Sequence, residues 1–160
     1  MEDFDAWAQF QSDPEATRFL GGPQSRALAW RTFMCMCGAW SVAGVAMFSV
    51  IEKASGQWIG RLGPWQPEGW PGTEVGWGIA RAHWGKGYAS EGAAAALDFA
   101  FDVLGWSEVI HVIALENVAS QGVARRLGST NLRRVQLPDP LQNIVADAWG
   151  QTREQWRAGR

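Results

Sequence analysis

The sequence predicts an α+β fold, a mixed α/β arrangement in which helices flank one central sheet. Its 160 residues, 47% of them hydrophobic, are enough to build one hydrophobic core. Segments with helical periodicity and short strand-like runs follow one another, and no internal repeat or low-complexity linker divides them. We therefore expect residues 1–160 to form a single domain.

Two helices are expected before the first strand. Residues 1–20 carry aromatic residues at helical spacing, interrupted at residues 13–14, where an aspartate suited to an N-cap precedes a proline. Ser25 is a suitable N-cap for a longer helix that runs towards Gly44, with Gly38 as an alternative end. The first quarter of the chain is therefore expected to be helical.

The middle of the chain has the pattern of strands. Residues 45–52 and 57–62 form two short runs joined by four turn-forming residues, as in a β-hairpin. A loop rich in proline, glycine and tryptophan follows at residues 65–72, and residues 73–80 are expected to form a further strand.

The second half alternates between helical and strand patterns. Asn117 can cap a helix that Gly128 ends. The elements expected from residue 90 on are a helix over 90–104, a strand covered on both faces over 109–115, a helix over 117–127, strands over 132–137 and 145–150, and a final turn from Thr152.

Charge and hydrophobicity exclude several classes of protein. The 14 Lys and Arg residues nearly balance 16 Asp and Glu residues, so no clustered basic face is expected for nucleic acid. The N-terminus is acidic, unlike a signal peptide, and the longest apolar stretch, residues 39–51, is too short to span a bilayer. Cys35 and Cys37 are expected to be small packing residues of a helix. We therefore expect a cytoplasmic protein with no nucleic-acid or membrane partner.

Gly85 and Gly87 lie between a predicted strand and a predicted helix. Such a turn points backbone N–H groups and the positive end of a helix dipole at an anion. A Walker A loop would need a glycine at Ala80, and a dinucleotide fingerprint would need one at Ser90, so neither motif fits. Taken alone, the turn is equally well explained as a flexible loop with a solvated Lys86.

Several motifs in order change this reading. The run Trp84-Gly-Lys-Gly-Tyr-Ala-Ser-Glu91, the alanine-rich helix after it, Asn117-Val-Ala-Ser120 and Arg126-Leu-Gly128 resemble the GNAT superfamily of acetyl-CoA-dependent N-acetyltransferases, in particular its RimJ/RimL-like branch. The resemblance is closest over Glu74–Gly128. It implies a twisted, mostly antiparallel sheet, splayed at its fourth strand and flanked by helices. It also implies transfer of the acetyl group to a primary amine, of a protein N-terminus or a small molecule, by direct attack.

The resemblance assigns part of the site to coenzyme A. It implies that the glycine-containing loop holds the pyrophosphate, that the splayed strand pairs with the pantetheine arm, that an asparagine contacts this arm, and that an arginine of the following helix holds the 3′-phosphate. The residues concerned are Ile79, Arg81, Gly85, Lys86, Gly87, Tyr88, Ala89, Ser90, Asn117 and Arg125, with Arg126 as an alternative to Arg125.

The chemistry needs a base for the amine and an acid for the leaving thiolate. Glu74, at the start of the splayed strand, is the first candidate base, and Glu68 is the alternative. Glu74 can equally be a strand-end carboxylate that pairs with Lys or Arg. The resemblance places Ser120 near the sulfur as the proton donor. Trp65 and Trp70, flanked by Pro and Gly, are candidate walls of the acceptor pocket.

Other interpretations stay open at this level. A non-catalytic acyl-CoA-binding protein and a tryptophan-rich ligand-binding module are the alternatives to an enzyme, while the eleven tryptophans are mostly expected in the core. No metal is expected, because His83 and His111 lack a third ligand at useful spacing. Relatives of the family suggest a possible homodimer. The family's first strand is expected to be missing before Met1, with a native start upstream as one explanation.

Overall fold

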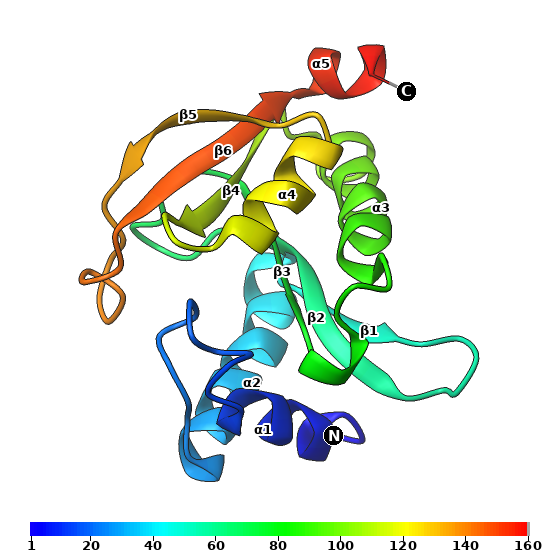
Figure 1. The fold of residues 1–160 in the computed structure, drawn as a ribbon, viewed down its shortest axis with the longest axis vertical. Coiled ribbons are helices and arrows are strands. Elements are labelled where there is room, and N and C mark those ends of the chain that lie inside the picture. The colour runs from blue at the N-terminus through cyan, green and yellow to red at the C-terminus, as the bar shows by residue number, and fades with distance from the viewer. Residues whose placement is uncertain (160) are drawn as a thin grey trace.

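The computed structural model describes residues 1–159, which form a six-stranded sheet flanked by helices (Figure 1). The elements, in chain order, are α1 (Phe4–Ser12), α2 (Arg26–Ala43), β1 (Phe48–Ile51), β2 (Trp58–Trp65), β3 (Glu74–Ile79), a 3₁₀ helix (Arg81–His83), α3 (Tyr88–Asp102), β4 (Glu108–Ala114), α4 (Val118–Arg126), β5 (Thr130–Val135), β6 (Ala146–Thr152) and α5 (Arg153–Ala158). The expected mixed α/β fold is confirmed. The N-terminus and α5 lie at opposite ends of the molecule (Figure 1).

The strand order is β1-β2-β3-β4-β6-β5. Every neighbouring pair is antiparallel except β3 and β4, which run parallel. This confirms the mostly antiparallel sheet. Within the described residues no strand precedes α1, so the strand expected to be splayed, residues 73–80, is the third strand of this chain.

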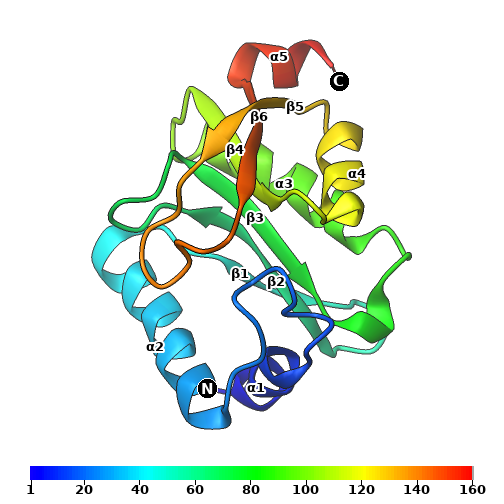
Figure 2. The ribbon, with the colours of Figure 1, turned by 60° about the vertical axis from the view of Figure 1, so that its left-hand side comes forward.

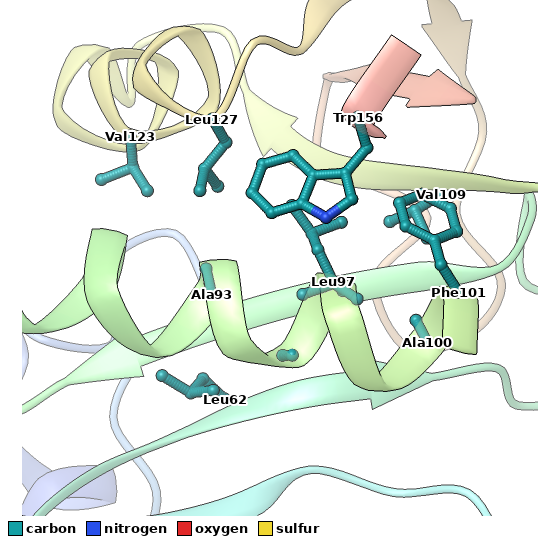
Figure 3. Packing of buried hydrophobic residues seen from close by; sticks show 11 residues of the cluster. Leu62, Ala93, Leu97, Ala100, Phe101, Val109, Val123, Leu127 and Trp156 are labelled. Carbon is teal, nitrogen blue, oxygen red and sulfur yellow. The ribbon is translucent and has the colours of Figure 1, made fainter. Parts of the chain in front are cut away.

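Helices cover the two faces of the sheet at the level of β3 (Figure 2). On one face, α3 and α4 contribute apolar side chains to the main core, where Leu97 and Phe101 of α3 are completely or almost completely buried. Trp156 of α5 closes this core over α3 (Figure 3). On the other face, α1 and α2 pack on each other and on β2 through a smaller cluster that contains Trp7 and Phe33.

Of the two helices expected before the first strand, the second begins and ends at its predicted caps. The Ser25 side chain accepts a hydrogen bond from the N–H of Leu28, and Gly44 ends α2 in the left-handed conformation, as predicted. The helix expected after Asp13 does not form. The Asp13 carboxylate accepts hydrogen bonds from the N–H groups of Glu15 and Ala16, but the chain then continues as turns to Gly22.

β3 and β4 separate after a single paired position, Glu74 opposite Ile110. Two side chains take the backbone groups that further pairing would need. The Glu74 carboxylate accepts from the N–H of Val112 at 3.0 Å, and His111 Nδ1 lies 2.6 Å from the carbonyl oxygen of Val75. The splay is therefore stabilised by side chains that pair with backbone groups of both strands.

Most tryptophans contribute to the core, as expected: Trp7, Trp149 and Trp156 are buried, and the half-buried Trp58, Trp77 and Trp106 pack against the core clusters. The prediction that the two cysteines are packing residues is wrong. Cys35 and Cys37 are free and exposed on α2, because this helix contacts the rest of the protein mainly through Ala29 and Phe33. Within residues 1–159, no helix has the length and apolar character that crossing a membrane requires.

Candidate active site

A cavity of about 450 Å³ opens at the splay, on the α1 and α2 face of β3. Both sequence-predicted catalytic residues and both sequence-predicted acceptor walls line it, together with one residue expected to contact the pantetheine arm. These residues are Glu74, Ser120, Trp65, Trp70 and Asn117. They come from β2, β3, α4 and the connecting loops, so the fold brings residues up to 55 positions apart to one space.

Glu74 is buried at the apex of the splay, with 5% of its surface exposed. Trp70 Nε1 donates to Oε2 at 2.6 Å, and the Val112 N–H donates to Oε1. Burial raises the pKa of Glu74 to about 7, although these two hydrogen bonds and the charge of Arg61 oppose the shift. Within residues 1–159, no Lys or Arg nitrogen lies within 4 Å of this carboxylate, so the simple strand-end ion pair is not formed.

Such a carboxylate is half ionised near neutral pH and can accept a proton from a bound group. Glu68, the alternative base, lines the same cavity but is exposed on the loop between β2 and β3. The two carboxylates therefore differ widely in burial, because Glu74 is enclosed by β3, β4 and Trp70 whereas Glu68 faces solvent.

Ser120 lies in the first turn of α4, facing the cavity from the opposite side of the splay. The Asn117 side-chain oxygen accepts from its N–H at 3.1 Å and caps the helix. Trp77 Nε1 donates to Ser120 Oγ at 3.2 Å. Because Oγ accepts this bond, its own hydrogen is available to a group in the cavity.

Arg61 is a cavity residue that the sequence did not single out. It extends from β2 on the face of β3 that carries Gly76 and Gly78, since Arg61 pairs with Gly78. Its guanidinium lies over the ring of Trp7, 5.5 Å from the centroid, and contacts the sulfur of Met47. Its Nε is buried without a hydrogen-bond partner, and burial lowers the pKa of Arg61 to about 10, so it remains charged at neutral pH.

The predicted phosphate loop lies beyond the other end of β3. Gly85 and Gly87 have φ angles of 76° and 89°, and a Cβ at either position would meet no atom within 4 Å. Gly87 is the N-cap of α3, so the loop presents backbone N–H groups at a helix N-terminus. The Tyr88 hydroxyl donates to Glu52, which holds the first turn of α3 against the β1–β2 hairpin. Ala89 packs against the main core.

The two arginines of α4 have different contacts, one with the phosphate loop and the other with the sheet. Arg126 Nη1 lies 3.2 Å from Ser90 Oγ, so Arg126 reaches the phosphate loop. Arg125, named first from the sequence, lies over the ring of Trp149 at 4.9 Å and bonds to Gln121 instead. The preference for Arg125 is therefore not supported by the geometry, and the alternative residue is the one beside the loop.

Two residues expected against the pantetheine arm have other surroundings. β3 ends at Ile79, and its carbonyl accepts from Trp84 Nε1 at 2.6 Å. Arg81 lies past the strand, in the 3₁₀ helix, with its guanidinium 3.3 Å from the Asp13 carboxylate. Because β3 ends at Ile79, Arg81 lies just beyond the strand, where the chain turns towards the phosphate loop.

Sequence reasoning missed Arg61 and also Trp77, which it assigned to the core. A charged side chain in the middle of an otherwise apolar and glycine-rich strand is the signal that could have identified Arg61. Trp77 carried no such signal, because a half-buried tryptophan in a strand has the same sequence pattern as a buried one.

Comparisons with known proteins identify the family of this chain. The sequence model of the family described as "Acetyltransferase (GNAT) domain" matches residues 1–130. The chain is 37% identical over 87 residues to the protein YkkB of Bacillus subtilis (strain 168), covering 53% of this chain and 51% of YkkB. It is 32% identical over 123 residues to the N-acetyltransferase p20 of Bacillus licheniformis, covering 75% and 69% of the two chains. The first of these matches thus spans only about half of the relative's length.

A solved structure is similar over almost the whole chain. The acetyltransferase from Agrobacterium tumefaciens str. C58 superposes with a TM-score of 0.83 at 27% identity, covering 96% of this chain and 86% of that one.

Proposed function

The chain belongs to the GNAT acetyltransferase family, and from this premise we propose that it transfers the acetyl group of acetyl-CoA to a primary amine by direct attack. The observation that carries the proposal is Glu74, a buried carboxylate with a pKa of about 7 that shares one cavity with Ser120. A base of this pKa is suited to take a proton from an amine at neutral pH.

The proposed substrate acetyl-CoA fits the loop at the N-terminus of α3. The open space over Gly85 and Gly87 and their left-handed backbone suit close approach of a pyrophosphate to backbone N–H groups. Arg126, 3.2 Å from Ser90, adds a guanidinium beside this loop. We accordingly assign Lys86, Tyr88, Ala89 and Ser90 to phosphate binding with the two glycines.

The roles of the remaining candidates follow from their positions. Asn117 uses its oxygen to cap α4, which leaves its NH₂ group to donate to the pantetheine arm. Ile79 and Arg81 are assigned to this arm through their backbone. Trp65 and Trp70 form walls of the cavity in which the amine binds. Trp70 also fixes the direction of the Glu74 carboxylate through its N–H.

The proposed reaction conserves atoms and charge. The substrate ammonium gives one proton to Glu74, and the resulting amine forms a C–N bond with the thioester carbonyl carbon. The C–S bond breaks as the tetrahedral intermediate collapses, and the second amine proton leaves as the amide forms. The thiolate takes a proton from Ser120 or from water, so the products are an N-acetyl amide, the free thiol of coenzyme A and one released proton.

Finer assignments accompany this proposal. The motif from Trp84 to Glu91 supports a place in the RimJ/RimL-like branch, with a protein N-terminus or a small-molecule amine as acceptor. The free cysteines on α2 support a reducing, cytoplasmic setting. A homodimer is the proposed assembly, which light scattering in solution would detect. No metal is assigned to the reaction.

Two measurements test the function. Acetyl-CoA should raise the thermal unfolding midpoint, whereas an oligosaccharide should not, because only the former binds the native fold. Thiol release from acetyl-CoA, screened over amine acceptors, should then identify turnover. A thermal shift without thiol release from any amine would favour the non-catalytic acyl-CoA-binding alternative, and no shift at all would contradict the proposal.

A further inference from the structure

Arg61 is a partly buried cation with no anion in direct contact, although the charge of Glu74 acts on it from a distance. Within residues 1–159, no carboxylate oxygen lies within 4 Å of its guanidinium nitrogens. Its contacts are the face of an indole ring and a thioether sulfur, and its Nε has no hydrogen-bond partner. A guanidinium in such surroundings lacks the hydrogen bonds that normally compensate the burial of a charge, so a ligand that supplied them would gain affinity.

Arg61 and Glu74 face the same small space over Gly76. The register of β2 and β3 places Arg61, Gly76 and Glu74 on one face of the sheet. The missing side chain of Gly76 leaves this space, where a Cβ would lie 3.3 Å from Glu74 Oε1 and 2.8 Å from the terminal methyl group of Met47. The Met47 sulfur in turn contacts Arg61. A single flexible thioether side chain therefore fills the interval between the cation and the carboxylate.

Met47 can leave this interval at little cost. Methionine is unbranched and has three rotatable bonds, so it adapts to a ligand more readily than other apolar residues. A ligand that replaced it would meet a base at one end and a guanidinium at the other. Beyond these two groups the cavity wall is largely aromatic and aliphatic, with Trp65, Trp70 and Phe19 among its residues.

We propose that the acceptor amine carries its own carboxylate, as in an α-amino acid with an apolar side chain, and that Arg61 binds this carboxylate while Glu74 faces the amine. The inference rests on the proposed acetyl transfer and names its substrate class. A guanidinium offers a carboxylate two parallel N–H donors, which fixes the orientation of the molecule as well as its charge. The carboxylate is unchanged in the reaction, so the bonds made and broken are those given above.

The test compares three acceptors that share a side chain: phenylalanine, phenylalaninamide and phenethylamine. They retain the amine and the ring, and only the first carries a carboxylate. Rates of thiol release, corrected for the fraction of unprotonated amine, should give phenylalanine a kcat/KM roughly 10- to 100-fold above the other two, the effect of one charge-assisted contact in a buried site. Equal values for the three acceptors in the wild-type protein would overturn the inference.

Arg61→Gln should remove this preference, mainly through a higher KM for phenylalanine, whereas Arg157→Gln, at the exposed surface of α5, should retain it. A preference that survives in Arg61→Gln would also overturn the inference.

Should that variant fail to fold, Arg61→Met replaces the unpaired charge by an apolar chain and is expected to unfold at a higher temperature. If the amide and the amine are acetylated as well as the acid, only the inference that the acceptor carries a carboxylate is refuted. If no amine causes thiol release, the proposed acetyl transfer itself is refuted.

Discussion

The two ends of β3 are built on different physical principles. Beyond its C-terminal end, the loop around Gly85 and Gly87 is exposed, and its groups suited to ligand binding are backbone N–H donors. At its N-terminal end, Glu74 is a buried carboxylate whose pKa depends on side chains from distant elements, among them Arg61, which extends over the same face of the sheet from its position opposite Gly78. Substitutions in the loop should therefore change ligand binding by steric hindrance, whereas substitutions in the cavity should change the ionisation of the groups that carry out the reaction.

The largest effect is expected at the cavity end. Glu74→Gln keeps the size of the side chain but removes the base, so turnover should fall by roughly 100-fold or more, the usual contribution of general base catalysis. Steady-state thiol release measures it. Glu68→Gln, which changes the exposed alternative carboxylate of the same cavity, is the matched control and should change turnover less than about threefold. The opposite ranking of the two variants would transfer the base role to Glu68.

Burial of Glu74 should also appear in the pH dependence of stability. Because its pKa is about 7 in the folded protein and 4.5 ordinarily, the native carboxylate binds its proton more tightly than the unfolded one. The wild type should therefore lose stability relative to Glu74→Gln as pH rises from below 4.5 to above 7. The free-energy difference should grow by about 3 kcal/mol, as 1.36 kcal/mol per pKa unit requires. Urea unfolding at both pH limits measures this change, and a constant difference would contradict the raised pKa.

At the loop end the expected effect is steric. Gly87→Val should raise the KM for acetyl-CoA by roughly 10-fold or more, because a β-branched side chain at φ 89° both strains the backbone and blocks close approach of a phosphate. Gly105→Val, at φ 72° after α3, imposes similar strain away from the loop and should lower stability without changing this KM. An equal rise in KM in both variants would mean that the loop binds no phosphate.

A smaller effect is expected where the two regions meet. Ser120→Ala removes the hydroxyl that faces the cavity but leaves Val112, Trp70 and Glu74 in place, and water can replace it as the proton donor. We expect a loss of turnover of roughly 10-fold, less than the usual contribution of a general acid because water takes over the role, with an unchanged KM for acetyl-CoA. A variant with full turnover would leave water as the donor.

The sequence predicted best what local chemistry determines. Ser25 and Asn117 mark the N-termini of two helices by their side-chain capping preferences, and the structure confirms both ends. The phosphate loop was identifiable for the same reason, since it consists of consecutive residues. Glu74 was found because it starts a strand next to an unusual loop.

The rest depended on contacts between distant segments. The surroundings of Arg61 depend on the packing of α1 over β2, which residues near position 61 do not predict. The choice between Arg125 and Arg126 depends on the rotation of α4 relative to the loop, which differs by about 100° between successive residues. Residues 14–20 have helical spacing, but they form turns that bring Phe19 and Leu20 to the cavity.

The pH dependence of kcat in the wild type and in Glu74→Gln tests the central claim most directly. With saturating acetyl-CoA and acceptor, the wild-type kcat should rise with pH to a plateau, with a midpoint near the pKa of about 7 that burial gives Glu74. In Glu74→Gln this rise should be absent and the residual rate should be low. A rise with the same midpoint in both proteins would contradict the account, because another group would then be the base.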